Sequence, residues 1–145
     1  MPRFLYRTLT VTLLSLLLVA CSTADASYSA GSGFTHSSRL TVLDSTETGK
    51  ALETELFAHG FNVIAGTKGG PAAQAEPQYI ARLIVRRTWR GVLSGTVPGT
   101  VSVTISDAKT GGVVATAQYV IGSMSYNNSR DAVQALVSAL EAKMR

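Results

Sequence analysis

The first 21 residues constrain this chain more than any other stretch. Arg3 and Arg7 make the N-terminus positive, and residues 9–20 are apolar except for two threonines and one serine. Cys21 follows directly and is the only cysteine among the 145 residues. A short positive segment, a short apolar segment and a small residue form the layout of a secretory signal, which is too short and wrongly flanked for a stable membrane span. We therefore expect residues 1–20 to be a signal peptide that is removed on export.

The end of this segment, Leu18-Val19-Ala20-Cys21, resembles the lipobox of bacterial lipoproteins. The resemblance implies cleavage between Ala20 and Cys21, a diacylglyceryl group on the Cys21 thiol, and an acylated new N-terminus. Several fatty chains anchor firmly, because each buried methylene contributes about 0.8 kcal/mol. Ser22 stands where an aspartate usually retains a lipoprotein in the inner membrane, so the resemblance implies the outer membrane with the domain in the periplasm. The alternatives are an ordinary secretory signal with an accidental cysteine, or an uncleaved anchor.

Composition bounds what the remaining chain can be. Removing residues 1–20 from the 145-residue chain leaves 125, which is enough for one domain with its own core. Removing Arg3 and Arg7 also lowers the formal net charge from +4 to +2, so charge gives no argument for a nucleic-acid partner. Once Cys21 is lipidated, no thiol is left for a disulfide, a thiolate zinc site or a catalytic nucleophile. The fold must therefore depend on hydrophobic packing.

Residues 21–38 are expected to form a lipidated flexible tether. Serine, alanine, glycine and threonine dominate the segment and no hydrophobic period is visible. Such a composition buries too little apolar surface to offset the entropy lost on ordering. The run Gly31-Ser32-Gly33 lacks the preceding strand and the following Lys-Ser/Thr of a phosphate-binding loop. Tyr28 and Phe34 are the residues of the tether that could dock on the domain or on a partner, and the tether would otherwise hold the domain a few nanometres off the membrane.

The single domain is expected to span residues 39–145 and to open as strand, helix, strand. Residues 39–43 alternate as a strand, and Asp44-Ser45-Thr46 offers side-chain oxygens that can cap the first turn of a helix. Gly60 stands where a C-terminal cap is needed. Residues 61–65 then predict a second strand, and the glycine- and proline-rich residues 66–78 predict a long loop.

The second half of the domain is expected to contain three strands and a helix. Residues 79–89, 100–106 and 113–121 alternate with period two, and Asp107 to Gly112 has the composition of a hairpin turn. Asn128 or Ser129 could cap the closing helix. This helix carries a continuous apolar stripe that we interpret as core packing, formed by Ala132, Val133, Leu136, Val137, Leu140 and Met144.

These elements predict an α+β fold. The expected architecture is a two-layer sandwich in which a mixed sheet of about five strands carries both helices on one face, in the order β-α-β-β-β-β-α. Three stretches resemble the TolB-N-terminal/LpoB/CsgG-like group of envelope lipoprotein domains: Leu40–Asp44, His59–Ile64, and the Asp-x-x-Thr-Gly hairpin within Val103–Val114. The resemblance implies a non-catalytic component that docks on an envelope enzyme or assembly. The glycine-rich loop and the run of arginines depart from the group.

No catalytic or metal-binding constellation is visible in the sequence. The two histidines, His36 and His59, have no metal-ligand spacing to another His, Asp or Glu. The nucleophile pattern Gly-x-Ser-x-Gly is absent. We therefore predict that the protein is not an enzyme and has no cofactor or metal.

One polar feature exceeds what an ordinary surface requires. Arg82, Arg86 and Arg90 share one face of the strand at 79–89 and its continuation, and Trp89 lies among them. Three guanidinium groups in a row could bind carboxylates or phosphates. A charged sheet face that discourages strand pairing is the alternative. The sequence thus predicts an accessory or scaffold lipoprotein with an envelope protein partner, or alternatively a module binding peptidoglycan or lipid head groups through Arg82, Arg86, Trp89 and Arg90.

Overall fold

A computed structural model describes residues 23–64, 76–89, 96–121 and 129–145. The predictions for the signal peptide, for cleavage between Ala20 and Cys21 and for lipidation of Cys21 lie outside the described residues. The same holds for Arg90, for the capping role of Asn128 and for most of the loop predicted at 66–78.

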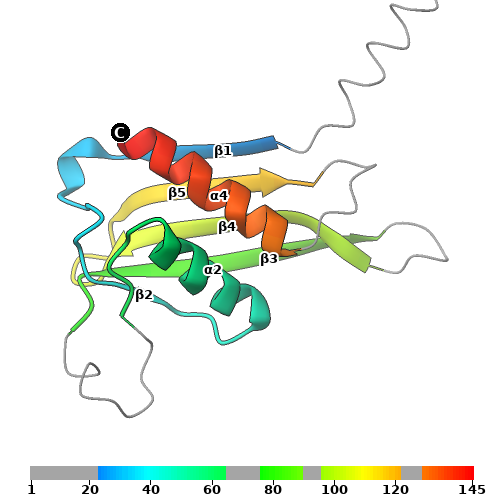
Figure 1. Ribbon diagram of the computed structural model, residues 1–145, viewed down its shortest axis with the longest axis horizontal. Coiled ribbons are helices and arrows are strands. Elements are labelled where there is room, and N and C mark those ends of the chain that lie inside the picture. The colour runs from blue at the N-terminus through cyan, green and yellow to red at the C-terminus, as the bar shows by residue number, and fades with distance from the viewer. Residues whose placement is uncertain (1–22, 65–75, 90–95, 122–128) are drawn as a thin grey trace, which may run out of the picture.

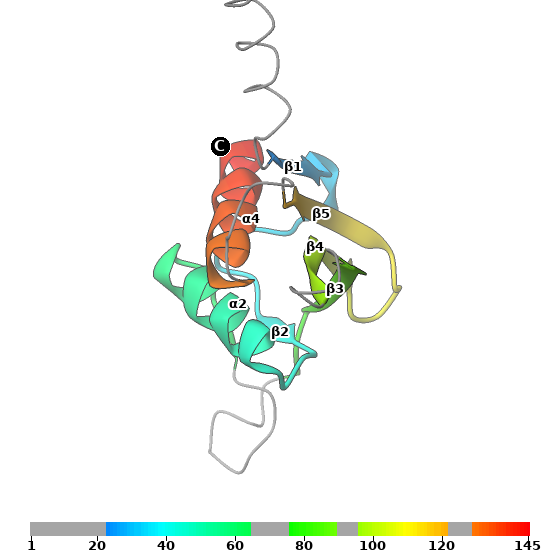
Figure 2. The same ribbon diagram turned by 90° about the vertical axis from the view of Figure 1, so that its right-hand side faces the viewer.

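The core of the fold is one five-stranded mixed sheet. The strands in sheet order are β1 (Thr23–Tyr28), β5 (Val113–Val120), β4 (Thr96–Asp107), β3 (Tyr79–Trp89) and β2 (Leu40–Val42). Only β2 and β3 are parallel, and the other neighbours are antiparallel. The helices α2 (Glu47–Ala58) and α4 (Ser129–Met144) both lie on one side of the sheet (Figure 2). The predicted α+β class is confirmed.

The predicted order of elements needs one correction. Residues 61–65 were predicted as a strand, yet in the described part of this range, residues 61–64, the strand pairing is an isolated bridge between Leu40 and Val63. Leu40 donates to the carbonyl of Asn62 at 3.0 Å and accepts from the amide of Ile64 at 2.8 Å. The missing fifth strand is β1, so the order is β-β-α-β-β-β-α (Figure 1).

The prediction of a flexible tether over residues 21–38 is wrong for its described part. β1 pairs with β5 along its whole length, from Thr23 opposite Val120 to Tyr28 opposite Ala115. The 3-10 helix η1 (Ala30–Ser32) follows. The physical reason is the ladder of backbone hydrogen bonds between β1 and β5. A strand of small residues is stable when its backbone groups pair with those of the strand at the edge of a sheet. Composition alone does not reveal that β5 offers such an edge.

An aromatic cluster holds the rest of this segment to the domain. Phe34 is fully buried, with its ring centroid 4.9 Å from that of Tyr79 and 6.0 Å from that of Phe61. The Tyr28 hydroxyl donates to the Phe34 carbonyl at 2.7 Å, and the Tyr79 hydroxyl donates to the Ser32 carbonyl at 3.1 Å. The docking suggested for Tyr28 and Phe34 is therefore confirmed, and it is against the domain itself.

Both ends of α2 follow the predicted chemistry. Thr46 is the N-cap, and its hydroxyl accepts from the amide of Gly49 at 3.2 Å. Gly60 has φ of +83° just after the C-cap, and the amide of Phe61 donates to the carbonyl of Leu56 at 3.0 Å. This pattern is a Schellman ending, in which glycine avoids the strain that a Cβ would bring.

The apolar stripe of α4 is core, as predicted. Its buried side chains pack toward the sheet, where β4 contributes Val101, Val103 and Ile105, each at most 3% exposed. The stripe's buried residues are Ala132, Val133, Leu136, Val137 and Leu140, and Met144 packs at its margin. Within the described ranges, the helices lack the combination of length and apolarity needed to cross a membrane.

Candidate functional site

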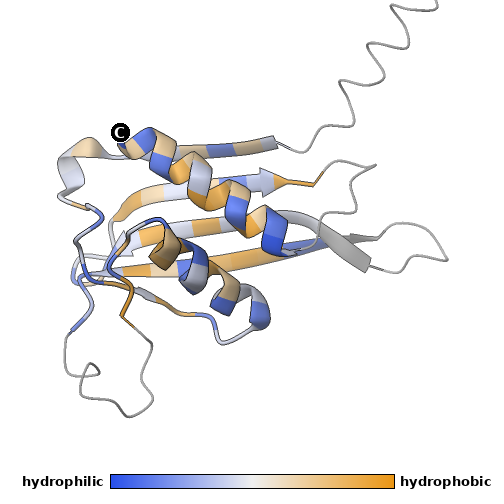
Figure 3. Cartoon of the chain, in the orientation of Figure 1, coloured by the Kyte–Doolittle hydropathy of each residue, from blue (hydrophilic) through white to orange (hydrophobic). Residues whose placement is uncertain are grey.

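The two faces of the sheet have different surroundings. Side chains alternate along each strand, as the orange and paler bands along β4 show in Figure 3, and one set points toward the two helices. No helix of the described residues lies on the other side (Figure 2). We call this second surface the open face. It is formed by Arg82, Ile84 and Arg86 of β3, Thr100, Ser102 and Thr104 of β4, Thr116, Gln118 and Val120 of β5, and Thr23, Asp25 and Ser27 of β1.

The structure brings two of the four predicted binding residues to the open face. Arg82 and Arg86 are both exposed, and at roughly 3.3 Å per residue they are about 13 Å apart along β3. Ile84 lies between them and is 52% exposed. Trp89 ends β3 with a side chain that is not described, and Arg90 lies outside the described residues. The roles of Trp89 and Arg90 stay predictions.

Asp25 is a residue of this face that the sequence analysis missed. It pairs with Gln118, which lies in one row with Ser102 and Ile84. Three strand spacings of about 4.8 Å therefore separate an acidic group on β1 from the arginines on β3. A shallow depression lined in part by Asp25, Ser27 and Gln118 lies on this side of the face. No sequence signal pointed to Asp25, because its segment has the composition of a linker.

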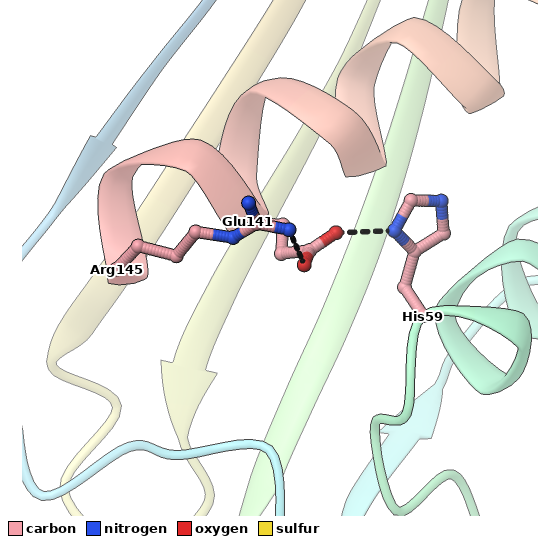
Figure 4. Close-up of polar contacts among 3 residues, drawn as sticks. All are labelled: His59, Glu141 and Arg145. Atoms are coloured by element: carbon pink, nitrogen blue, oxygen red, sulfur yellow. Dashed lines mark hydrogen bonds and ion pairs between the residues drawn. The ribbon is translucent and has the colours of Figure 1, made fainter.

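A second polar cluster joins the C-terminal ends of the two helices (Figure 4). The Nδ1 atom of His59 lies 2.5 Å from Oε2 of Glu141, and Arg145 donates to Oε1 of Glu141 at 2.6 Å. The hydrogen bond from Arg145, followed by that of His59, lowers the pKa of Glu141 to about 2. The cluster links α2 to α4 and is a structural contact. In the described part of the chain, no group of three or more His, Cys, Asp or Glu could hold a metal ion.

The Asp-x-x-Thr-Gly motif is a hairpin turn between β4 and β5. The Asp107 carboxylate accepts from the amides of Lys109 and Thr110, both at 2.8 Å. These two hydrogen bonds hold the pKa of Asp107 below its usual value. Gly111 has φ of +73°, which completes the turn. The motif that supported the family resemblance thus has a local structural role, and it adds no group to the open face.

Comparison with known proteins gives fold neighbours only. No protein-family model and no curated protein matches this sequence. The structure resembles two crystal forms of the PelC dodecamer from Paraburkholderia phytofirmans. One has 16% identity and a TM-score of 0.57, and the other, a point variant of PelC, has 14% identity and a TM-score of 0.55. In both cases the match covers 86% of this chain and 97% of the PelC chain.

A PDZ domain protein from Parabacteroides distasonis is more distant. It is 13% identical with a TM-score of 0.48, and the match covers 83% of this chain but 36% of that protein. The two PelC structures therefore provide the comparison that matters here. At their level of identity, the likeness establishes a shared fold.

Proposed function

We propose that this chain is a non-catalytic lipoprotein of the cell envelope. In this proposal, lipidated Cys21 anchors it in the outer membrane, and its periplasmic domain docks on a protein assembly as an accessory or scaffold subunit. The lipobox resemblance supports the anchor. The observation that carries the docking role is the open face, a broad sheet surface beside which the described chain places no helix.

The side chains of the open face favour a protein partner. Ile84 is 52% exposed and Val120 is 42% exposed, although both are large apolar residues. Arg82 and Arg86 flank Ile84, and arginine beside exposed apolar groups is typical of interface centres. An antiparallel sheet can also leave one face in water without binding anything, so the mixture of apolar and arginine side chains is the decisive feature.

The fold neighbours are compatible with this role. PelC, which has the same fold, is described as a dodecamer. A fold that assembles from many copies in one protein supports a setting of multiple subunits for this one. The predicted TolB/LpoB/CsgG-like resemblance points in the same direction and stays a prediction.

A crosslinking pull-down from intact envelopes tests the proposal. Wild-type protein should capture a reproducible envelope partner, and the Arg82→Glu variant should capture several-fold less while remaining folded. Lys109→Glu is the matched control, because Lys109 is exposed on the β4–β5 turn away from the open face. The Cys21→Ala chain should lose both lipid and membrane association. Equal capture by wild type and Arg82→Glu would exclude the open face as the interface.

The alternative is an anion-binding module for peptidoglycan or lipid head groups. The specific observation in its favour is that Arg82 and Arg86 are both exposed on one face. Binding to purified sacculi or to anionic vesicles should weaken as salt screens the charges. The double variant Arg82→Gln/Arg86→Gln should bind less at every salt concentration. Binding that ignores salt, or an absence of binding, would reject this alternative.

A further inference from the structure

The distance between the proposed anchor and the folded domain is short. β1 begins at Thr23, only two residues after Cys21. Two residues can span at most about 7 Å, because a fully extended chain advances about 3.6 Å per residue. If Cys21 carries the lipid, as proposed above, the first residue of β1 must lie within that distance of the lipidated residue.

β1 cannot easily move away from the domain to lengthen this link. All six of its residues pair with β5, and α4 packs against the same strand. Ala26 is buried under α4, and Phe34 fixes the chain beyond the strand in the aromatic cluster. Releasing β1 would therefore break a full ladder of hydrogen bonds and expose part of the core.

The register identifies the end of the domain that faces the membrane. Thr23 pairs with Val120, which pairs with Thr100, which in turn pairs with Arg86. These residues form the row at which β1 starts and β5 ends (Figure 1). We call this row, together with Arg87, the anchor end. β3 continues beyond the row for three residues to Trp89, which is roughly 10 Å at 3.3 Å per residue. The paired ends of β3 and β4 thus reach as far as the anchor does.

The charges at the anchor end suit a phospholipid surface. Arg86 and Arg87 are consecutive and both exposed, at the point of β3 where the pairing with β4 shifts by one residue. Guanidinium groups bind phosphate oxygens well, and arginines close to an anionic bilayer surface are attracted to it. The first turn of α4 adds one exposed base, Arg130, and one exposed acid, Asp131, which offset each other in net charge.

We propose that the domain lies directly on the bilayer through its anchor end, with Arg86 and Arg87 against the phosphates of anionic phospholipids. This deepens the proposed function and rests on it, because the orientation follows from a lipid on Cys21. The strands then rise from the membrane, the Asp107–Gly112 turn points away from it, and the open face is presented sideways. A partner docking on the open face must reach it next to the membrane.

Two labelled positions on β5 test this orientation in the full, lipidated protein. Val120 and Val113 are both exposed valines of the same strand, 42% and 58% exposed, at opposite ends of it. At about 3.3 Å per residue, their seven-residue separation is roughly 23 Å. Since the native chain's only cysteine is the acylated Cys21, Val120→Cys or Val113→Cys provides a single site for a fluorophore. The labelled proteins are reconstituted into phosphatidylglycerol–phosphatidylethanolamine vesicles that carry a head-group quencher.

The proposal predicts several-fold stronger lipid quenching at position 120 than at position 113. Equal quenching at the two positions would overturn it. Shielding of position 120 from a soluble quencher without lipid quenching would also overturn it, because another protein surface would then cover this end. The intact mass of the mature protein reports its acylation, so an unlipidated protein contradicts the proposed function, whereas a lipidated one with equal quenching contradicts the orientation alone.

A variant with a longer spacer tests the contribution of the two arginines to membrane contact independently of the short link to Cys21. A flexible insert of about 20 residues between Ser22 and Thr23 removes the constraint of the anchor, so that contact depends on the domain surface. Quenching at position 120 should persist on phosphatidylglycerol-containing vesicles and fall on phosphatidylcholine alone. Adding Arg86→Gln/Arg87→Gln should reduce it several-fold on the anionic vesicles. Quenching that is unchanged by this substitution would overturn the role of the two arginines.

Discussion

Both faces of the sheet are built from the same strands, yet they have different roles. We call the face that packs against α2 and α4 the covered face. On the covered face of β4, Val103 is 3% exposed and lies beneath the helices. On the open face, the adjacent residue Thr104 is partly exposed, and no helix of the described chain packs over it. Successive side chains of a strand point to opposite sides, so one sequence supplies both surfaces. We therefore expect substitutions on the covered face to change stability and substitutions on the open face to change binding.

The largest loss of stability is expected from the aromatic cluster at the margin of the covered face. Phe34→Ala should lower the free energy of unfolding by about 3–5 kcal/mol, because a fully buried ring is replaced by a cavity. Phe57→Ala on α2 is the control, since Phe57 is 73% exposed, and it should change stability by less than about 0.5 kcal/mol. Urea unfolding measures both. Equal effects on the free energy of unfolding would mean that residues 29–38 behave as a linker that does not contribute to the core.

Neighbouring positions on β4 give the next largest contrast. Val103→Ala removes buried methyl groups and should cost about 2 kcal/mol. Thr104→Ala, one residue along on the open face, should cost less than about 0.5 kcal/mol. Denaturant unfolding of the two variants gives the difference directly. A larger cost for Thr104→Ala would mean that the open face is part of the core.

The helix-end cluster on the covered side should give a smaller, pH-dependent effect. The pKa of Glu141 is lowered from 4.5 to about 2, so its ionised form stabilises the fold above the unfolded pKa, and this stabilisation is lost as the pH falls through about 2. Glu141→Gln should therefore lower the Tm at pH 7, and the difference from wild type should shrink between about pH 4.5 and pH 2.

Arg145→Gln serves as the comparison for this prediction. It removes the largest cause of the pKa shift and leaves the hydrogen bond between His59 and Glu141. Its effect on the Tm should have the same direction and a smaller size. Thermal unfolding followed across the pH range measures both variants. A Glu141→Gln difference that stays constant down to pH 2 would contradict the ion-pair account.

Local sequence signals predicted most of the covered face. The period of two identified β3, β4 and β5, and the Asp-x-x-Thr-Gly turn located the hairpin between the last two strands. The 3.6-residue hydrophobic period predicted α4, and the glycine after α2 predicted where that helix ends. These elements were predictable because each is determined by residues close together in the chain.

The edge of the sheet was not predictable in this way. β1 consists of small residues, and its side chains meet partners far along the chain, as in the 2.7 Å contact between Ser27 and Thr116. Residues 61–65 had the stronger strand signal, but Phe61 is used by the ending of α2 and by the aromatic cluster. Arg82 and Arg86 were correctly placed together because both lie on one strand, whereas Asp25 was found only once β1 was in the sheet.

The smallest change in stability is expected on the open face, where the change in binding should be largest. Arg82→Gln/Arg86→Gln should alter the free energy of unfolding by less than about 0.5 kcal/mol, because both side chains are exposed. The same variant should lose most of the partner capture seen with wild-type envelopes. Unfolding curves and crosslinked pull-downs on one preparation measure both quantities. A destabilised variant that still captures its partner would contradict this prediction. The two arginines would then contribute to stability, and the binding surface would lie elsewhere.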